Sequence, residues 1–173
     1  MTALGAKRLL KPLHPPHADN SLPMKNVNKS VLIWYSPAEM FALVTDVARY
    51  SEFLPWCDQT KVLEQDASGM TAEVGMTFGG LKKSFVTRNT HSEMENGGKQ
   101  VSIRLIKGPF SRLEGHWRFH PVGDGKQRAC RIELQLDYGF ESAALAAVIG
   151  PVFDRIASSM VDAFIKRAEQ VYG

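Results

Sequence analysis

A chain of 173 residues, 44% hydrophobic and 23% charged, has the length and composition of one globular domain that needs no disulfide or metal to hold its core. The net charge is +3, of which +2 falls in the first 23 residues, so the rest carries only +1. This balance gives no strong basis for binding nucleic-acid phosphates, and we expect no DNA partner. No apolar stretch reaches the roughly 20 residues that a membrane span requires.

The first 23 residues contain four prolines and show no sustained hydrophobic periodicity, so we expect a disordered N-terminal extension. Three basic residues and one acidic residue give the segment a weak similarity to an organellar transit peptide. An unstructured extension upstream of a start at Met24 is the simpler interpretation. We therefore expect one domain over residues 24–173.

The domain begins with a β-rich segment, residues 27–35, which predicts a first strand. Ser36, Pro37 and Glu39 then predict the start of a helix. Serine can cap the first turn, proline suits the first helical position, and glutamate three residues after the serine completes a capping box. A second short helix is expected around residues 48–53.

Between residues 57 and 140, turn signals rich in glycine separate six segments that we predict as strands, which makes seven with the first. In the last two, apolar residues alternate with charged or polar ones: Leu113, Gly115, Trp117 and Phe119, then Ile132, Leu134, Leu136, Tyr138 and Phe140. This period of two indicates antiparallel strands with one face packed inward and the other in water.

Residues 142–171 predict a long amphipathic helix with an apolar side of Leu145, Val148, Val152, Ile156, Met160, Phe164 and Ala168. Gly150 and Pro151 interrupt it. Because an interior proline costs about 3 kcal/mol, either the helix is kinked there or a short turn precedes it. One helix cannot cover a flat sheet of seven strands, so we expect an α+β fold in which the sheet curls around the helix and leaves an elongated apolar space.

Three motifs carry a resemblance to a known family. The segment YSEFLPWC at residues 50–57 resembles the Y-P-x-F-L-P-W-C signature of the coenzyme-Q-binding START family, with Ser51 in place of the usual proline. Residues 108–119 are similar to its G-P-F-x-x-L-x-G-x-W-x-F segment, and residues 160–173 to its C-terminal helix. Over residues 24–173, the resemblance implies a helix-grip (START-like) fold, with a curved seven-stranded antiparallel sheet around the last helix and two short helices after the first strand.

The resemblance implies non-catalytic binding of a polyprenyl quinone, ubiquinone, in an apolar tunnel, and a role as a lipid chaperone in respiration. Burial of each five-carbon isoprene unit could contribute roughly 3–4 kcal/mol before entropic costs. An indole N–H of Trp56 or Trp117, or the hydroxyl of Tyr138, could bind the quinone head. A filled core is the other interpretation of many of the expected ligand-binding residues, which are Phe53, Leu54, Trp56, Phe78, Phe110, Leu113, Trp117, Phe119, Tyr138, Val152, Ile156 and Met160.

Polar groups on the predicted inner faces are few, so we expect no enzymatic activity; a cyclase-like reaction is the only one that the superfamily suggests. Thr87, Asn89 and His91 share one face of a predicted strand. They could place polar atoms inside the domain, and an exposed strand end explains them equally well.

The chain shows no strong metal or disulfide signal. His116 and His120 are four residues apart on a predicted strand, which separates them by ~13 Å and does not suit a metal site. Cys57 and Cys130 form no paired motif, and we expect two reduced thiols.

Bacterial members of the family are often labelled ribosome association toxins. The alternative function is therefore a regulator that binds the large ribosomal subunit and blocks subunit association. The nearly neutral domain argues against it, as does the lack of an aromatic ladder or glycine-rich RNA motif. Under the quinone hypothesis we expect a cytoplasmic protein that contacts the inner membrane transiently, as a peripheral protein.

Overall fold

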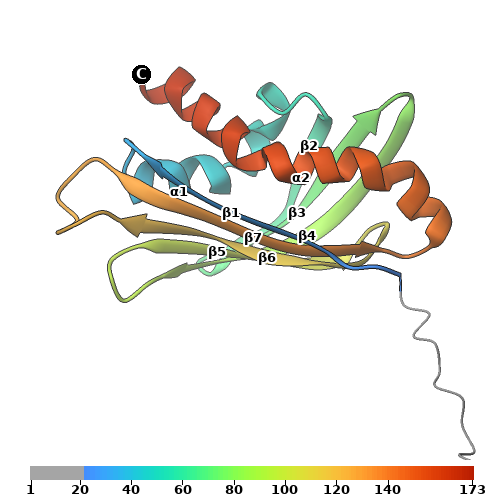
Figure 1. Ribbon diagram of the computed structural model, residues 1–173, viewed down its shortest axis with the longest axis horizontal. Helices are drawn as coiled ribbons and strands as arrows, with labels where there is room; N and C mark the ends of the chain where they lie inside the picture. The colour runs from blue at the N-terminus through green and yellow to red at the C-terminus, as the bar shows by residue number, and fades with distance from the viewer. Residues whose placement is uncertain (1–21) are drawn as a thin grey trace, which may run out of the picture.

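The computed structural model describes residues 22–173 (Figure 1). Within this range the chain forms seven strands, two α-helices and one 3₁₀ helix, which confirms the predicted order of elements. Disorder was expected for residues 1–23. Of these, residues 1–21 lie outside the described part of the chain.

The seven strands form one sheet in the order β1-β7-β6-β5-β4-β3-β2. All neighbouring strands are antiparallel. From β2 to β7 each strand pairs with the next one along the chain, while β1 pairs with β7. The strands are β1 (Lys25–Ile33), β2 (Cys57–Asp66), β3 (Gly69–Phe78), β4 (Leu81–Glu93), β5 (Lys99–Lys107), β6 (Phe110–Pro121) and β7 (Cys130–Phe140).

The helices α1 (Pro37–Thr45), η1 (Val47–Glu52) and α2 (Ala143–Tyr172) lie on one side of the curved sheet (Figure 1). The Ser36 hydroxyl accepts a hydrogen bond from the Glu39 N–H at 3.1 Å, and the Glu39 carboxylate accepts one from the Ser36 N–H at 2.7 Å. The predicted capping box is therefore confirmed. The predicted second helix is the 3₁₀ helix η1. Together these elements make the expected helix-grip fold.

The inner faces of β6 and β7 are those that the alternating pattern predicts. Phe119 and Ile132 are fully buried, and Trp117 is 4% exposed. Phe164 of α2 packs against Trp117 with ring centroids 5.3 Å apart, and nearer the start of α2 Phe153 packs against Phe110 at 4.8 Å. These two aromatic contacts, one toward each end of α2, attach the helix to the sheet.

The last helix is continuous through Pro151, and Ser142 caps it by accepting a hydrogen bond from the Leu145 N–H at 3.1 Å. Of the two alternatives, a separate turn before Pro151 is therefore wrong, and the kinked helix is confirmed. Figure 1 shows the first turns of α2 bent relative to the rest of the helix. Proline lacks an N–H for the preceding turn and crowds the carbonyl four residues earlier, which accounts for the bend.

The buried side of α2 differs from the predicted one near its start. Val148 is 59% exposed and Val152 is half-buried, whereas Ile149 and Phe153 are buried. Four residues advance an α-helix by about 400°, roughly 40° beyond a full turn. A run of four-residue steps such as Val148, Val152 and Ile156 therefore drifts around the helix, while mixed steps of three and four stay on one face.

By length and composition alone, α2 could cross a membrane. Its buried residues pack against the sheet, however, and the core helix of a compact domain has the same composition. We interpret α2 as the core helix of this fold.

Candidate functional site

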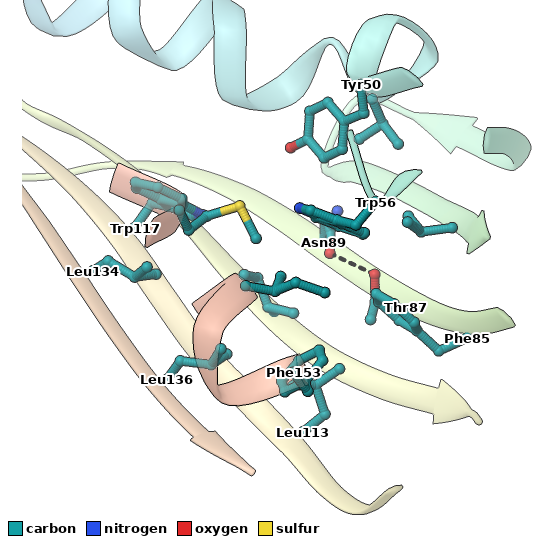
Figure 2. Close-up of a pocket in the computed structure, with 15 residues that line it drawn as sticks. Tyr50, Trp56, Phe85, Thr87, Asn89, Leu113, Trp117, Leu134, Leu136 and Phe153 are labelled. Carbon is teal, nitrogen blue, oxygen red and sulfur yellow. Dashed lines mark hydrogen bonds between the residues drawn. The ribbon is translucent and has the colours of Figure 1, made fainter. Parts of the chain in front are cut away.

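A cavity of about 100 Å³ lies between α2 and the sheet (Figure 2). Its walls come from η1, the link before β2, strands β3 to β7, and the middle of α2. The lining residues are Val47, Tyr50, Trp56, Val74, Phe85, Thr87, Asn89, Ile103, Leu113, Trp117, Leu134, Leu136, Phe153, Ile156 and Met160. Trp117 and Phe153 each belong to one of the two aromatic contacts of α2, so the cavity is the space between them.

Gly115 explains why the sheet leaves room at this place. It occupies an inward position on β6, and its partners across the ladder are Ile103 on β5 and Leu136 on β7, which both line the cavity. A Cβ atom on Gly115 would lie 2.0 Å from the carbonyl oxygen of Gln135, so the close approach of β7 excludes any side chain there. No side chain therefore covers the inner face of the sheet at Gly115.

One strand brings polar atoms to the cavity wall. Thr87 and Asn89 of β4 line it, and Thr87 is only 4% exposed. The Thr87 hydroxyl donates a hydrogen bond to the side-chain oxygen of Asn89 at 3.0 Å (Figure 2). These two side chains therefore face inward, and the alternative explanation, that they lie at an exposed strand end, is excluded.

His91, the third polar residue of that strand face, does not line the cavity. Its ring packs edge-on against Phe41 with centroids 5.3 Å apart. Burial, with a smaller contribution from the nearby Arg88 charge, lowers the pKa of His91 and favours its neutral form.

Two indole rings line the cavity. Trp117 stacks on Phe119 with ring centroids 6.1 Å apart. The backbone oxygen of Trp56 accepts a hydrogen bond from the Thr77 N–H at 2.9 Å, which ties the link before β2 to β3. Both side chains line the cavity, and an indole N–H can only donate a hydrogen bond.

Five of the twelve predicted ligand-binding residues line the cavity: Trp56, Leu113, Trp117, Ile156 and Met160. Six others do not: Leu54, Phe110, Phe119 and Tyr138 are buried in the core, Phe53 is half-buried against it, and Val152 of α2 is half-buried. The side chain of Phe78 lies outside the described part of the structure.

The residues that miss the cavity fill the space around it. Leu54 and Phe119 are at most 1% exposed and are enclosed by other side chains. The Tyr138 hydroxyl donates a hydrogen bond to the Asp154 carboxylate at 2.5 Å, so it is not free for a quinone head. An alternating pattern predicts which side chains point inward. It does not predict which of these pack against other side chains and which line a cavity.

The expected ligand-binding residues did not include ten wall residues: Val47, Tyr50, Val74, Phe85, Thr87, Asn89, Ile103, Leu134, Leu136 and Phe153. A usable signal existed for Leu134 and Leu136, whose inward positions follow from the alternation in β7. For Phe153 the signal was the 3.6-residue period of an α-helix. The predicted apolar side, with its four-residue steps through Val148 and Val152, did not include Phe153.

The walls can do little acid–base chemistry. Their one titratable side chain is Tyr50, whose hydroxyl donates a hydrogen bond to the Val44 carbonyl at 2.5 Å. Burial raises the pKa of Tyr50 well above its ordinary value, so the phenol stays protonated. An apolar ligand with a small neutral polar group suits such walls.

The two cysteines lie outside the cavity and are unbonded. Burial raises the pKa of Cys57 to about 11 and that of Cys130 to about 12, so both are protonated thiols at neutral pH. Among the residues that the structure describes, no three His, Cys, Asp or Glu side chains gather as they would around a metal ion.

Comparisons with known proteins agree with this architecture. The chain is 41% identical over 150 residues to the ribosome association toxin RatA of Vibrio cholerae, which covers 87% of this chain and 99% of the relative. It is 29% identical over 147 residues to the mitochondrial coenzyme Q-binding protein COQ10 homolog B of Xenopus laevis, across 84% of this chain and 59% of that protein.

A solved structure of the same fold is the Zhui aromatase/cyclase from Streptomyces, with a TM-score of 0.71 over 86% of this chain and 95% of that one. At 15% identity this likeness concerns the fold alone. Residues 33–165 match the family model described as polyketide cyclase/dehydrase and lipid transport. The chain therefore belongs to the polyketide cyclase/dehydrase and lipid transport family.

Proposed function

We propose that this protein binds a polyprenyl quinone of the ubiquinone type between α2 and the sheet, and that it acts as a lipid chaperone without catalysing a reaction. The observation that carries the proposal is the chemistry of the cavity walls. Apolar side chains surround the space, the polar groups are neutral, and no acid–base pair or nucleophile is in place. The name of the Xenopus relative, a coenzyme Q-binding protein, supports the same ligand.

The size of the cavity requires the walls to move when the ligand enters. Drug-sized ligands occupy pockets of about 300–1,000 Å³, and a cavity of about 150 Å³ holds one benzene ring. The present 100 Å³ is therefore smaller than a cavity that holds one ring, and it matches only a short apolar fragment. A longer tail must separate α2 from the sheet, and the ~3–4 kcal/mol gained per buried isoprene unit supplies the driving force.

The start of α2 suits a transient contact with a membrane surface on the cytoplasmic side of the inner membrane. Residues 142–153 carry no charge, and Val148 within them is 59% exposed. An exposed apolar helix end can enter the headgroup region, and its movement would bring the ligand from the bilayer to the cavity.

Extraction of the purified protein with organic solvent, followed by mass spectrometry, tests the proposal. Wild-type protein should retain quinone. Val74→Phe, which places a ring into the cavity at a cost of about 1–3 kcal/mol in stability, should retain much less. Glu114→Gln on the outer face of β6 is the matched control and should retain the wild-type amount. Wild-type protein without quinone, or equal quinone in Val74→Phe, contradicts the proposal.

A second candidate function is supported by relatives named ribosome association toxin from Vibrio cholerae, Pseudomonas aeruginosa and Escherichia coli, which are 38–41% identical to this chain over 90–99% of their length. Under this function the protein binds the large ribosomal subunit and hinders subunit association. Co-sedimentation of the protein with isolated large subunits, lost as salt is raised, would support it. Wild-type and Val74→Phe proteins should then sediment equally, because the filled cavity leaves the surface unchanged.

A further inference from the structure

The two ends of the sheet differ in charge. Because neighbouring strands alternate in direction, the turns after β3 and β5 lie at the end where β7 leads into α2 (Figure 1). These two turns with their flanks, residues 77–83 and 105–112, carry four cations and no acidic residue. The turns after β2 and β4, residues 64–69 and 93–99, lie at the opposite end and carry four acidic residues and one lysine.

The other links change this contrast little. The loop after β6, residues 121–130, adds one aspartate, one lysine and one arginine to the acidic end, and the link before α2 adds Glu141 to the basic end. The described domain, nearly neutral as a whole, is therefore positive where α2 begins. Such an asymmetry orients a protein toward a surface of opposite charge.

Three lysines dominate the positive end. Lys82, Lys83 and Lys107 are all exposed, and the side chain of Lys82 is 76% exposed with its ammonium 3.8 Å from the Asp58 carboxylate. The fourth cation, Arg112, forms an ion pair with Glu114. We call Lys82, Lys83 and Lys107, with the turns that carry them, the lysine end.

Exposed apolar side chains accompany these lysines. Ile106 is adjacent to Lys107 in the sequence and is 51% exposed, and the uncharged first turns of α2 at the same end expose Val148 at 59%. Apolar side chains gain by entering the headgroup region of a bilayer, while lysines beside them bind anionic headgroups. The phosphate backbone of an RNA attracts the lysines equally well but offers no apolar layer for Val148 and Ile106.

The lysine end also lies next to the cavity wall. Lys83 and Phe85 are two residues apart on β4, so they share one face of the strand, and Phe85 lines the cavity. The turn after β5 packs on the same residue, since a Cβ atom on Gly108 would lie 2.6 Å from the Cβ of Phe85. A surface bound by the lysine end is therefore close to the wall through which a ligand must pass.

We propose that the lysine end docks the protein on a bilayer that carries anionic phospholipid headgroups. This inference rests on the function proposed above and names the lipid class that the start of α2 meets. The lysines provide the selectivity for anionic headgroups, and the apolar side chains provide a contribution that salt does not screen.

Co-sedimentation with vesicles tests the docking surface. Wild-type protein should bind vesicles of phosphatidylcholine mixed with phosphatidylglycerol much more tightly than vesicles of phosphatidylcholine alone, and binding should fall as salt is raised. Each lysine near an anionic surface contributes about fivefold, so Lys83→Gln combined with Lys107→Gln should weaken binding to the mixed vesicles about 25-fold.

A matched control removes the same charge at the opposite end. Lys126 of the β6–β7 loop and Lys166 near the end of α2 are both exposed, and Lys126→Gln combined with Lys166→Gln should change binding by about twofold or less. Val148→Ser should weaken binding to the mixed vesicles without changing its salt dependence, because it removes apolar area and no charge.

Two results would overturn the docking surface: equal binding of the wild type to both kinds of vesicle, or equal losses in the two double variants. Quinone extraction separates this proposal from the previous one. A wild type that contains quinone but ignores the mixed vesicles overturns the docking alone, and one that binds them through Lys83 and Lys107 without containing quinone overturns the quinone function alone. If these lysines bind large ribosomal subunits and no vesicle, the partner is RNA and the lipid proposal is overturned.

Discussion

Replacement of Phe153 by alanine should show how strongly α2 is held over the cavity. The ring is 4% exposed, and its centroid lies 4.8 Å from those of both Phe110 and Tyr138 and 6.3 Å from that of Phe140. Phe153 also forms part of the cavity wall. Its removal therefore breaks the contact of the first half of α2 and enlarges the cavity at the same time.

The expected loss of unfolding free energy has two parts. Transfer of the side chain out of the core costs about 2 kcal/mol. The new space, of the order of 100 Å³, joins the existing cavity and costs about 2.4 kcal/mol at ~24 cal/mol per Å³. The sum of about 4.4 kcal/mol lies in the upper half of the range of ~3–5 kcal/mol for such substitutions. Phe153→Leu, which keeps most of the volume, should lose only about 1–1.5 kcal/mol.

Urea unfolding with and without a two-isoprene quinone measures both consequences. Because the new space is continuous with an apolar cavity, the ligand should stabilise Phe153→Ala more than it stabilises the wild type. Phe153→Leu serves as the control for a shape change without a large hole. A loss below about 1 kcal/mol in the alanine variant, or equal stabilisation by the ligand in both proteins, would refute this account of the cavity wall.

Three further outcomes follow from other contacts. Tyr138→Phe should lose about 1–2 kcal/mol of stability, because its hydroxyl donates to a carboxylate on α2, yet extraction should yield the wild-type quinone content. Hydrogen bonds from Arg128 hold the pKa of Glu39 below its ordinary 4.5, so this stabilisation is present above pH 4.5 and is lost as pH falls through the lowered pKa. Glu39→Gln keeps the capping geometry. Its loss of unfolding free energy relative to the wild type, measured in urea, should be ~0.5 kcal/mol at pH 7 and should shrink toward zero at acid pH. A loss that does not change with pH contradicts the ion pair. Gly150→Ala combined with Pro151→Ala should stabilise the protein by up to ~3 kcal/mol and slow quinone release in stopped-flow exchange, and unchanged release would make the bend static.

The local elements could be predicted from the sequence because their causes are local. Ser36 and Glu39 are three residues apart and complete their hydrogen bonds within one helical turn. The alternation in β6 and β7 depends only on the geometry of an extended chain, so the buried faces of both strands follow from it. The family motifs around Trp56 and Gly115 then implied the fold, since curvature of the sheet around α2 does not follow from spacing alone.

Only the tertiary structure decided which of the inward-facing residues line the cavity. Leu54 and Leu134 are both apolar, inward and nearly fully buried, yet only Leu134 lines the cavity, because Leu54 is enclosed by its neighbours while Leu134 faces the gap between α2 and the sheet. The orientation of Thr87 and Asn89 was likewise open, since a polar face suits a strand end as well as an interior. Both outcomes depend on where α2 crosses the strands. That crossing results from packing between residues far apart in the sequence, which no local pattern encodes.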